Sequence, residues 1–358
     1  MLIVRSPVRI SFAGGGTDLP AFYEQFGGSV LSAAINKYFY TILGKRSDGR
    51  IQVISSDLRI FETWRDIATM DERGSGLEIP LAVMKDLGRD MSLDLFLASE
   101  IPPGTGLGSS ASVCVNILKT LTTYLQIPLS RYDLAERAFR IAREGLKRHV
   151  GKQDEYAAAY GGLNWIVFHR DGGTEVNPVT LPPEFARVFE ASLMLFFTGS
   201  AHHSWTILEE QEQSTRTLGS TPVRALKRTE SFVPKMHDAL MKSDLQRFGA
   251  LLDQAWQAKK QVSSKISTSR IDHMYRVARE HGALGGKITG AGGGGFLLLC
   301  CEQERQSDVR RALTAEGIRE MTFAFDAHGA QIIANDPFID SDEATGSRWT
   351  FVPVSSRV

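Results

Sequence analysis

A glycine-rich segment, PPGTGLGSSAS at residues 102–112, has the composition of a loop that binds phosphate groups. Glycine adopts positive φ without a steric penalty, and the helical pattern that follows predicts free N–H groups and a positive dipole end. No Gly-Lys-Ser/Thr closes the segment as in a Walker A loop, and Ser109 stands where a dinucleotide fingerprint has its last glycine. The segment predicts a polyphosphate site, and a glycine-rich connector with a serine cap is the alternative.

A second glycine run, KITGAGGGGFLLL at residues 287–299, formally contains the GxGxxG pattern. The residues that follow the glycines, 296–300, have the pattern of a strand rather than a helix. A dinucleotide site requires a helix at this point, so the run fails the structural context of that motif. The two remaining interpretations are a second phosphate-binding segment and a tight hairpin without a ligand.

The composition favours small-molecule chemistry in a folded protein. The 358 residues are 42% hydrophobic and 23% charged, which predicts two domains with substantial cores. Because 41 basic residues balance 41 acidic ones, we expect neither nucleic acid nor a membrane as a partner. The three cysteines fit neither a disulfide framework nor a metal site, and no apolar run has the length of a membrane span. We therefore expect a cytoplasmic protein.

Periodicity outlines the elements that must position these loops. The predicted strands are 2–12, 38–43, 51–55, 93–98, 163–168, 191–197, 296–300 and 321–325. Helices are predicted from residue 113 to 125 and at 131–148, 155–160, 204–217, 223–241, 245–262 and 306–316. Pro234 should kink or end the helix at 223–241. Prolines at 178, 182 and 183 suggest a domain boundary, which divides the chain into residues 1–184, 185–335 and a tail, 336–358.

Three motifs together resemble those of the GHMP kinases, named for galactokinase, homoserine kinase, mevalonate kinase and phosphomevalonate kinase. SPVRISFAGGGTDLP at 6–20 is similar to the family's substrate-side motif, the segment 102–112 to its central motif and 287–299 to its third. The motifs have the family's order and cover the chain to about residue 300. The resemblance implies an α+β fold of two domains, the first like ribosomal protein S5 domain 2 and the second ferredoxin-like, with ATP and sugar between them.

The resemblance also implies a site for ATP with Mg²⁺. The nucleotide residues that it implies come from both glycine runs: Pro103, Gly104, Gly106, Leu107, Gly108, Ser109, Ser110, Ala111, Gly292 and Gly293. Ser110 and Glu144 match the positions of the two Mg²⁺ ligands. For Glu144, an exposed charge on a helix face rich in arginine and lysine is the alternative.

Phosphoryl transfer to a hydroxyl needs an anchored triphosphate, a metal, positive charge at the γ-phosphate and a carboxylate that deprotonates or orients the acceptor. The resemblance assigns the carboxylate to Asp154, in GKQDEY at 151–156, and a positive group to Arg9. Capping of the short helix by Asp154 and solvent exposure of Arg9 are the alternatives. Related kinases carry Gln where this chain has Glu155, which adds a negative charge beside the predicted base.

The predicted sugar contacts are Gly15, Gly16, Thr17, Asp18 and Gly293. Galactokinases carry Glu-His where this chain has Gly15-Gly16, and the absence of two side chains should open space for a longer or phosphorylated sugar. In their amino-acid sequences, the motifs are most similar to those of the D-glycero-D-manno-heptose 7-phosphate kinases. These enzymes phosphorylate O1 to form the 1,7-bisphosphate, on the route to nucleotide-activated heptose for surface polysaccharides.

We therefore expect an ATP-dependent sugar kinase with this specificity, whose partners are ATP and a sugar phosphate. Another sugar 1-kinase, of the fucose or galactose type, is the alternative within the enzyme class. A sensor of the same fold that binds ATP and sugar without turnover is the alternative outside it. Asp154 argues against the sensor, since binding alone requires no base. Association into a homodimer is left open.

Overall fold

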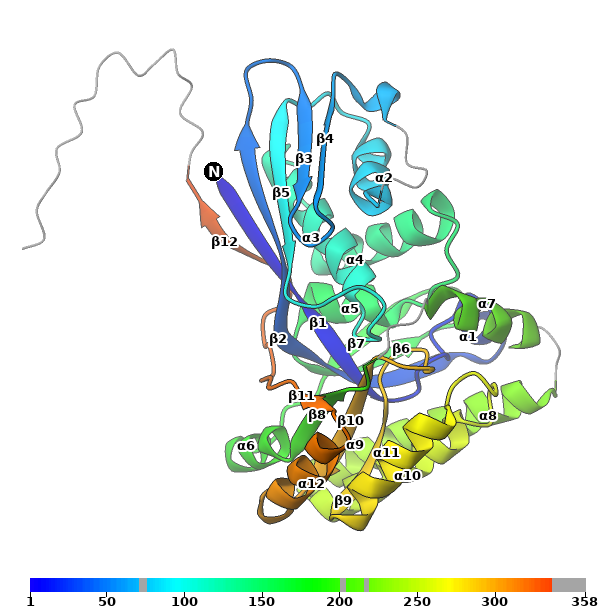
Figure 1. Ribbon diagram of the computed structural model, residues 1–358. Helices are drawn as coiled ribbons and strands as arrows, with labels where there is room; N and C mark the ends of the chain where they lie inside the picture. Colours follow the sequence, from blue (N-terminus) through cyan, green and yellow to red (C-terminus); the bar gives the residue numbers. More distant parts are fainter. Residues whose placement is uncertain (71–75, 200–203, 216–218, 337–358) are drawn as a thin grey trace, which may run out of the picture.

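The computed structural model describes residues 1–70, 76–199, 204–215 and 219–336, so the predicted tail lies outside the described residues from position 337 on. Two sheets form the two halves of the molecule (Figure 1). The larger has the strand order β12-β1-β2-β5-β3-β4, with β6 on β2 and β7 on β6, and the smaller has the order β11-β8-β10-β9. No helix among the described residues combines the length and apolar character needed to cross a membrane.

The larger sheet consists of β1 (Leu2–Ala13), β2 (Gly28–Lys45), β3 (Ile51–Ser55), β4 (Ile60–Trp64), β5 (Leu93–Ser99), β6 (Leu163–Phe168), β7 (Thr174–Pro178) and β12 (Gln331–Asn335). The smaller consists of β8 (Leu193–Phe197), β9 (Ala283–Ile288), β10 (Phe296–Cys301) and β11 (Arg319–Glu320). β12 pairs with β1, so a strand from beyond the boundary predicted at 184/185 joins the larger sheet. The boundary itself stays a prediction.

Helices cover both sheets (Figure 1). Those packed near the larger sheet are α1 (Pro20–Phe26), α2 (Glu78–Leu87), α3 (Ser109–Tyr124), α4 (Arg131–Arg140) and α5 (Gln153–Tyr160), with a 3₁₀ turn at Ile67–Thr69 and a π-helical turn at Ile141–Gly145. The others are α6 (Pro183–Ala191), α7 (Ser204–Thr215), α8 (Thr221–Glu230), α9 (Phe232–Met241), α10 (Leu245–Lys259), α11 (Ser269–Glu280) and α12 (Gln303–Ala315).

β1 extends through both halves and ties their cores together. Leu2 and Val4 at its start pack in the core under α2 to α5, whereas Ile10 and Phe12 pack in the core that α10 and the smaller sheet share. The ring of Phe12 lies 5.4 Å from that of Phe248, centroid to centroid, on α10. The middle of β1 therefore lies at the junction of the two halves, which places Arg9 there.

Two predicted helices differ from the observed ones, and several observed elements, among them α1, α2, α6, β4, β7 and β12, had no predicted counterpart. The helix predicted at 131–148 becomes a π-helical turn after Arg140, in which Leu146 N–H donates to Ile141 O, five residues back, at 2.9 Å. The helix predicted at 223–241 is two helices, and Pro234 lies in the first turn of α9, where its missing N–H removes no intrahelical bond.

The prediction of a strand at 321–325 was wrong. Only Phe325 makes a β-bridge, to Ile35, among the described residues. The backbone N–H of Ala324 donates to Asn36 Oδ1 at 2.7 Å, and that of Phe325 donates to Glu190 Oε2 at 2.6 Å. Side chains therefore satisfy these two N–H groups in place of a sheet partner.

Candidate active site

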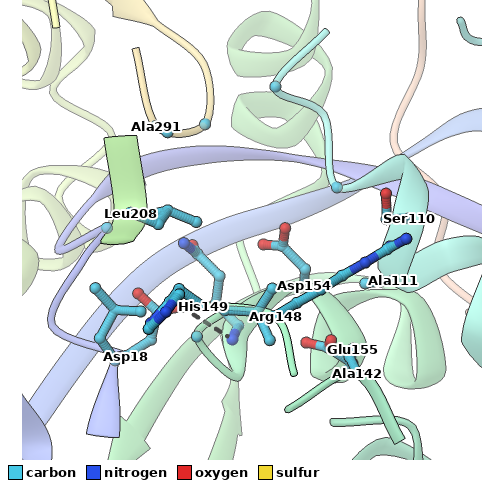
Figure 2. Close-up of a pocket in the computed structure, with 18 of the residues that line it drawn as sticks. Asp18, Ser110, Ala111, Ala142, Arg148, His149, Asp154, Glu155, Leu208 and Ala291 are labelled. Atoms are coloured by element: carbon cyan, nitrogen blue, oxygen red, sulfur yellow. Dashed lines mark hydrogen bonds between the residues drawn. The ribbon is translucent and has the colours of Figure 1, made fainter. Parts of the chain in front are cut away.

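A cavity of about 500 Å³ lies where the two halves meet (Figure 2). Its walls come from β1, the segment before α1, the loop before α3, the chain from the π-helical turn to α5, α7, α10 and the second glycine run. Twelve of the predicted site residues line it: Arg9, Gly15, Gly16, Asp18, Pro103, Gly104, Gly106, Gly108, Ser109, Ser110, Ala111 and Asp154. With Gly290 and Ala291 of the second glycine run, all three motifs and the predicted base, distant in sequence, thus meet in one cavity.

Five predicted residues do not line this cavity: Thr17, Leu107, Gly292, Gly293 and Glu144. The hydroxyl of Thr17 donates to Ser29 O at 3.0 Å and accepts from Ser29 N at 3.1 Å, so the fold uses its donor and one of its two acceptor positions. Leu107 is buried in the core, and its carbonyl accepts from Arg9 N at 2.9 Å. The N–H of Gly293 donates to Ile266 O at 2.8 Å.

Arg9 joins Asp154 to the loop before α3. Its Nη2 and Nε lie 2.6 Å and 2.7 Å from Asp154 Oδ1, and its Nη1 donates to Gly106 O at 2.7 Å. The side chain of Arg9 is 4% exposed, whereas that of Asp154 is 27% exposed. The charge-assisted pair fixes the carboxylate, which lines the cavity, at the edge of the loop.

The glycines of the two runs allow backbone contacts that a side chain would prevent. Gly108 has φ +77°, and a Cβ there would lie 3.1 Å from Asp154 Oδ2, so the glycine lets the carboxylate approach the N-terminus of α3. Gly106 has φ +79°, and its Cβ would lie 2.5 Å from Thr289 O in the second run. Gly290 in turn lies against Gly106. The two runs therefore pack on each other across the two halves.

Polar side chains from three elements converge on Gly15. A Cβ there would lie 3.6 Å from Ser11 Oγ, 3.6 Å from Gln153 Nε2 and 3.8 Å from Lys259 Nζ. Within the described chain, the buried atoms Ser11 Oγ and Gln153 Oε1 have no hydrogen-bond partner. Buried polar atoms are normally paired, and both of these residues line the cavity, so a ligand there can supply the missing partners. We call this part of the cavity, with Asp18, the acceptor corner.

Gly16 has a different role from Gly15. Its φ is +100°, and a Cβ there would overlap the side-chain amide of Gln211 on α7. That amide donates to Gly16 O at 3.4 Å. Of the two positions where galactokinases carry Glu-His, only Gly15 has room for a side chain, because helix α7 covers Gly16.

An acidic and a basic side chain, Asp18 and Lys259, both line the acceptor corner. Asp18 Oδ1 accepts from Gly16 N at 2.8 Å, and burial raises the pKa of this carboxyl, as does the charge of Asp154. Lys259, the last residue of α10, donates to Gly290 O, and burial with the nearby Arg9 lowers its pKa to about 8. The corner thus offers an acceptor for hydroxyls and a cation that titrates near neutral pH.

Glu212 on α7 holds the segment before α5. Its carboxylate accepts from Arg143 at 2.6 Å and 2.8 Å and lies 2.8 Å from His149 Nδ1. The hydrogen bonds from Arg143, with burial opposing them, lower the pKa of Glu212 to about 2. This network fixes the chain that carries Arg148 and His149 along the cavity (Figure 2).

Glu144, the predicted Mg²⁺ ligand, and Glu155, the residue after the predicted base, line different cavities. Glu144 lines a separate cavity of about 210 Å³, next to Asp86 and Arg140. Glu155 lines the main cavity, and burial, followed by the charge of Asp154, raises the pKa of its carboxyl well above the usual range. No group of three or more His, Cys, Asp or Glu side chains in the described chain is arranged to bind a metal ion.

Several residues of the site were not predicted from the sequence. Ser11, Gln153, Gln211 and Lys259 line the cavity without belonging to a predicted set. Ser11 and Gln153 were adjacent to recognised motif residues, and their position beside Arg9 and Asp154 was the available signal. Gln211 and Lys259 lie on helices of the second half, and nothing in the local pattern marked them.

Known proteins match this chain along most of its length. Models of the GHMP kinases N terminal domain and of GHMP kinases C terminal match residues 78–162 and 236–319. The D-glycero-alpha-D-manno-heptose 7-phosphate kinase of Campylobacter jejuni is 30% identical over 332 residues, which are 91% of this chain and 97% of that protein. A galactokinase of Pyrococcus furiosus is 23% identical and covers 90% of this chain and 95% of its own.

Solved structures confirm the predicted two-domain α+β fold. The structure of a D-glycero-D-manno-heptose 1-phosphate kinase from Bacteroides thetaiotaomicron has a TM-score of 0.79 at 27% identity and covers 94% of this chain and 100% of its own. The Lactococcus lactis galactokinase complexed with galactose has a TM-score of 0.73 at 20% identity, with 92% and 94% covered, which shows the fold alone. The chain belongs to the GHMP kinases and is an ATP-dependent sugar kinase.

Proposed function

We propose that the protein transfers the γ-phosphate of ATP to O1 of D-glycero-D-manno-heptose 7-phosphate and forms ADP and the 1,7-bisphosphate. The names of two relatives support a heptose phosphate as the sugar. The observation on which the chemistry rests is the ion pair between Arg9 and Asp154 beside the glycine loop. It puts a carboxylate and a cation at the loop that is suited to a polyphosphate.

In this proposal the phosphates of ATP lie along residues 103–111. The N-terminus of α3 and the guanidinium of Arg9 supply positive potential there. Ser110 lines the cavity and offers an oxygen donor of the kind that Mg²⁺ accepts, whereas Glu144, the second predicted ligand, lines the separate cavity. When bound, Mg²⁺ spreads the negative charge of the triphosphate.

Asp154 is the proposed base and Asp18 the proposed acceptor of a sugar hydroxyl. The O1 hydroxyl gives its proton to Asp154 as O1 bonds to the γ-phosphorus, and the bond between that phosphorus and the β–γ bridging oxygen breaks, which releases ADP. Arg9 orients the base through two contacts to one carboxylate oxygen. Lys259 adds a positive charge on the opposite side of the acceptor corner.

The test is a panel of acceptors that comprises heptose 7-phosphate, fucose, galactose and mevalonate. ADP formation gives the rates, and ³¹P NMR of the product locates the new phosphate. We expect heptose 7-phosphate to exceed the others in kcat/KM by roughly 100-fold or more, with a phosphate at the anomeric carbon. A preference for fucose or galactose would show that the proposed substrate is wrong and would identify the sugar instead. Binding of ATP and sugar without turnover would instead indicate the sensor.

Replacing Gly15 with leucine should raise KM for the sugar by about tenfold or more and leave KM for ATP within about twofold. The new side chain would occupy space beside Ser11, Gln153 and Lys259, away from the glycine loop. Steady-state kinetics with each substrate varied in turn measures both constants. Gly44→Leu is the matched control, since Gly44 is a strand glycine outside the cavity. Equal rises in both constants would contradict the assignment of this corner to the sugar.

The pH profile should report the charge of Lys259. Because the pKa of this buried amine is about 8, its cationic form is lost as pH rises through 8, and kcat/KM for the sugar should fall over that range. Arginine stays charged, so Lys259→Arg should move the descending limb upward by about one pH unit or more. Profiles of kcat/KM between about pH 6 and 10 measure this. An unchanged limb in the arginine variant would exclude Lys259 as its source.

A further inference from the structure

Lys152 is a buried cation, two residues before the proposed base, that does not line the cavity. Its Nζ donates to Glu136 Oε1 on α4 at 2.7 Å and to Gly172 O, in the turn between β6 and β7, at 2.6 Å. The rings of Tyr23 and Phe139 have their centroids 5.7 Å and 5.3 Å from the ammonium. A buried charge is costly unless it is paired, and these contacts pair the ammonium with the protein rather than with a phosphate.

Glu136 connects α4 with two other elements. Its Oε1 also accepts from the hydroxyl of Tyr156 on α5 at 2.5 Å and from that of Thr174 on β7 at 3.4 Å. Tyr156 is fully buried, and burial, followed by the hydrogen bond to Glu136, raises the pKa of its phenol, which therefore stays a donor. A single carboxylate thus joins α4 to the first turn of α5 and to the hairpin of β6 and β7.

Lys152 and Tyr156 attach the same face of α5 to this carboxylate. The two residues are four positions apart, and Tyr156 N donates to Lys152 O at 3.3 Å, so they lie one helical turn apart. Asp154 stands midway between them, about 200° of helical rotation from each. Its carboxylate therefore lies on the other side of the helix, where it lines the cavity and contacts Arg9 at 2.6 Å. The rotation of α5 about its axis decides where this carboxylate lies.

The start of α5 is also joined to the acceptor corner. Lys152 N donates to Asp18 O at 3.2 Å, and Gln153 N donates to Asp18 Oδ2 at 3.3 Å. We propose that Lys152 and Glu136 are positioning residues, which hold α5 in the rotation that directs Asp154 at the acceptor hydroxyl. The inference rests on the proposed function, because it takes Asp154 as the base.

A double-mutant cycle between Lys152→Met and Asp154→Asn tests the inference. Methionine keeps the apolar part of the lysine side chain but donates no hydrogen bond to Glu136. We expect Lys152→Met alone to lower kcat by about tenfold or more, because the rate depends steeply on the position of the base, and to leave ATP affinity within about twofold. In the Asp154→Asn background the same change should lower kcat by less than about twofold, since no base remains to be positioned.

Glu136→Gln is the milder variant, because its amide oxygen still accepts hydrogen bonds, and it serves if Lys152→Met does not fold. It should lower kcat by about threefold, with the same coupling to Asp154. Arg137→Met, on the same helix, is the matched control. Arg137 Nε pairs with Asp86 at 2.6 Å outside the cavity, so this variant should keep kcat within about twofold even where its Tm falls as far as that of Lys152→Met.

A wild-type kcat in Lys152→Met, with the expected loss in Asp154→Asn, would overturn this inference and leave the proposed function intact. An equal loss of kcat in both backgrounds would also overturn it, because the lysine would then act on something other than the base. A wild-type kcat in Asp154→Asn would instead show that Asp154 is not the base, so the proposed mechanism and this inference would fail together.

Discussion

Replacing Asp154 with asparagine is expected to lower kcat by about two orders of magnitude or more while the affinity for ATP stays within about threefold. Asparagine keeps the shape of the side chain but neither accepts the acceptor's proton nor pairs as a charge with Arg9. The nucleotide contacts proposed for residues 103–111 do not involve the carboxylate. Steady-state kinetics and ATP binding by calorimetry measure the two quantities on the same preparation.

Asp86→Asn is the matched control for this experiment. Asp86 also pairs with arginines, with 2.6 Å between its Oδ2 and Arg137 Nε, but it lies outside the main cavity. The control should keep kcat within about twofold, because partly exposed ion pairs contribute little and this one touches no substrate. A kcat near the wild-type value in Asp154→Asn would show that another group removes the proton. Loss of ATP binding in that variant would instead indicate that the Asp154 carboxylate contributes to nucleotide binding.

Replacing Gly106 with valine should weaken ATP binding by about tenfold or more and lower Tm by several degrees. Two costs add at this position. A β-branched residue is strained at φ +79°, and its Cβ would lie 2.5 Å from Thr289 O, so the two glycine runs would have to separate. The loop before α3 would then shift relative to the second half of the molecule, and the walls of the cavity would move apart. Calorimetry with ATP and thermal unfolding report the two effects.

Gly49→Val separates these two costs. Gly49 has φ +72° and no atom within 4 Å of the position of a Cβ, so its valine variant experiences the strain without the collision. We expect this control to lose about 1–2 kcal/mol of stability and to bind ATP normally. If Gly106→Val behaves like Gly49→Val in both assays, the contact between the two runs does not organise the nucleotide site.

The sequence by itself predicted the features that depend on local residue type. Glycine runs at 102–112 and 287–299 indicated close backbone approach, because only glycine adopts positive φ freely. Periodicity predicted β1, β3, β5, α3 and α10 to within a few residues, since their apolar faces repeat along one segment. The resemblance of the motifs to GHMP kinases, now confirmed by the comparisons, pointed to Arg9 and Asp154 before their 2.6 Å contact was known.

Only the tertiary structure decided which side chains reach the cavity. Glu144 and Ala142 lie in the same segment, and the π-helical turn and its packing determine that Ala142 faces the cavity. Lys259 and Gln211 enter the site from helices in the second half, and β12 returns from the end of the chain to pair with β1. The direction of a side chain depends on how a whole element is rotated and docked. That rotation is set by contacts between segments far apart in the sequence, which no local pattern records.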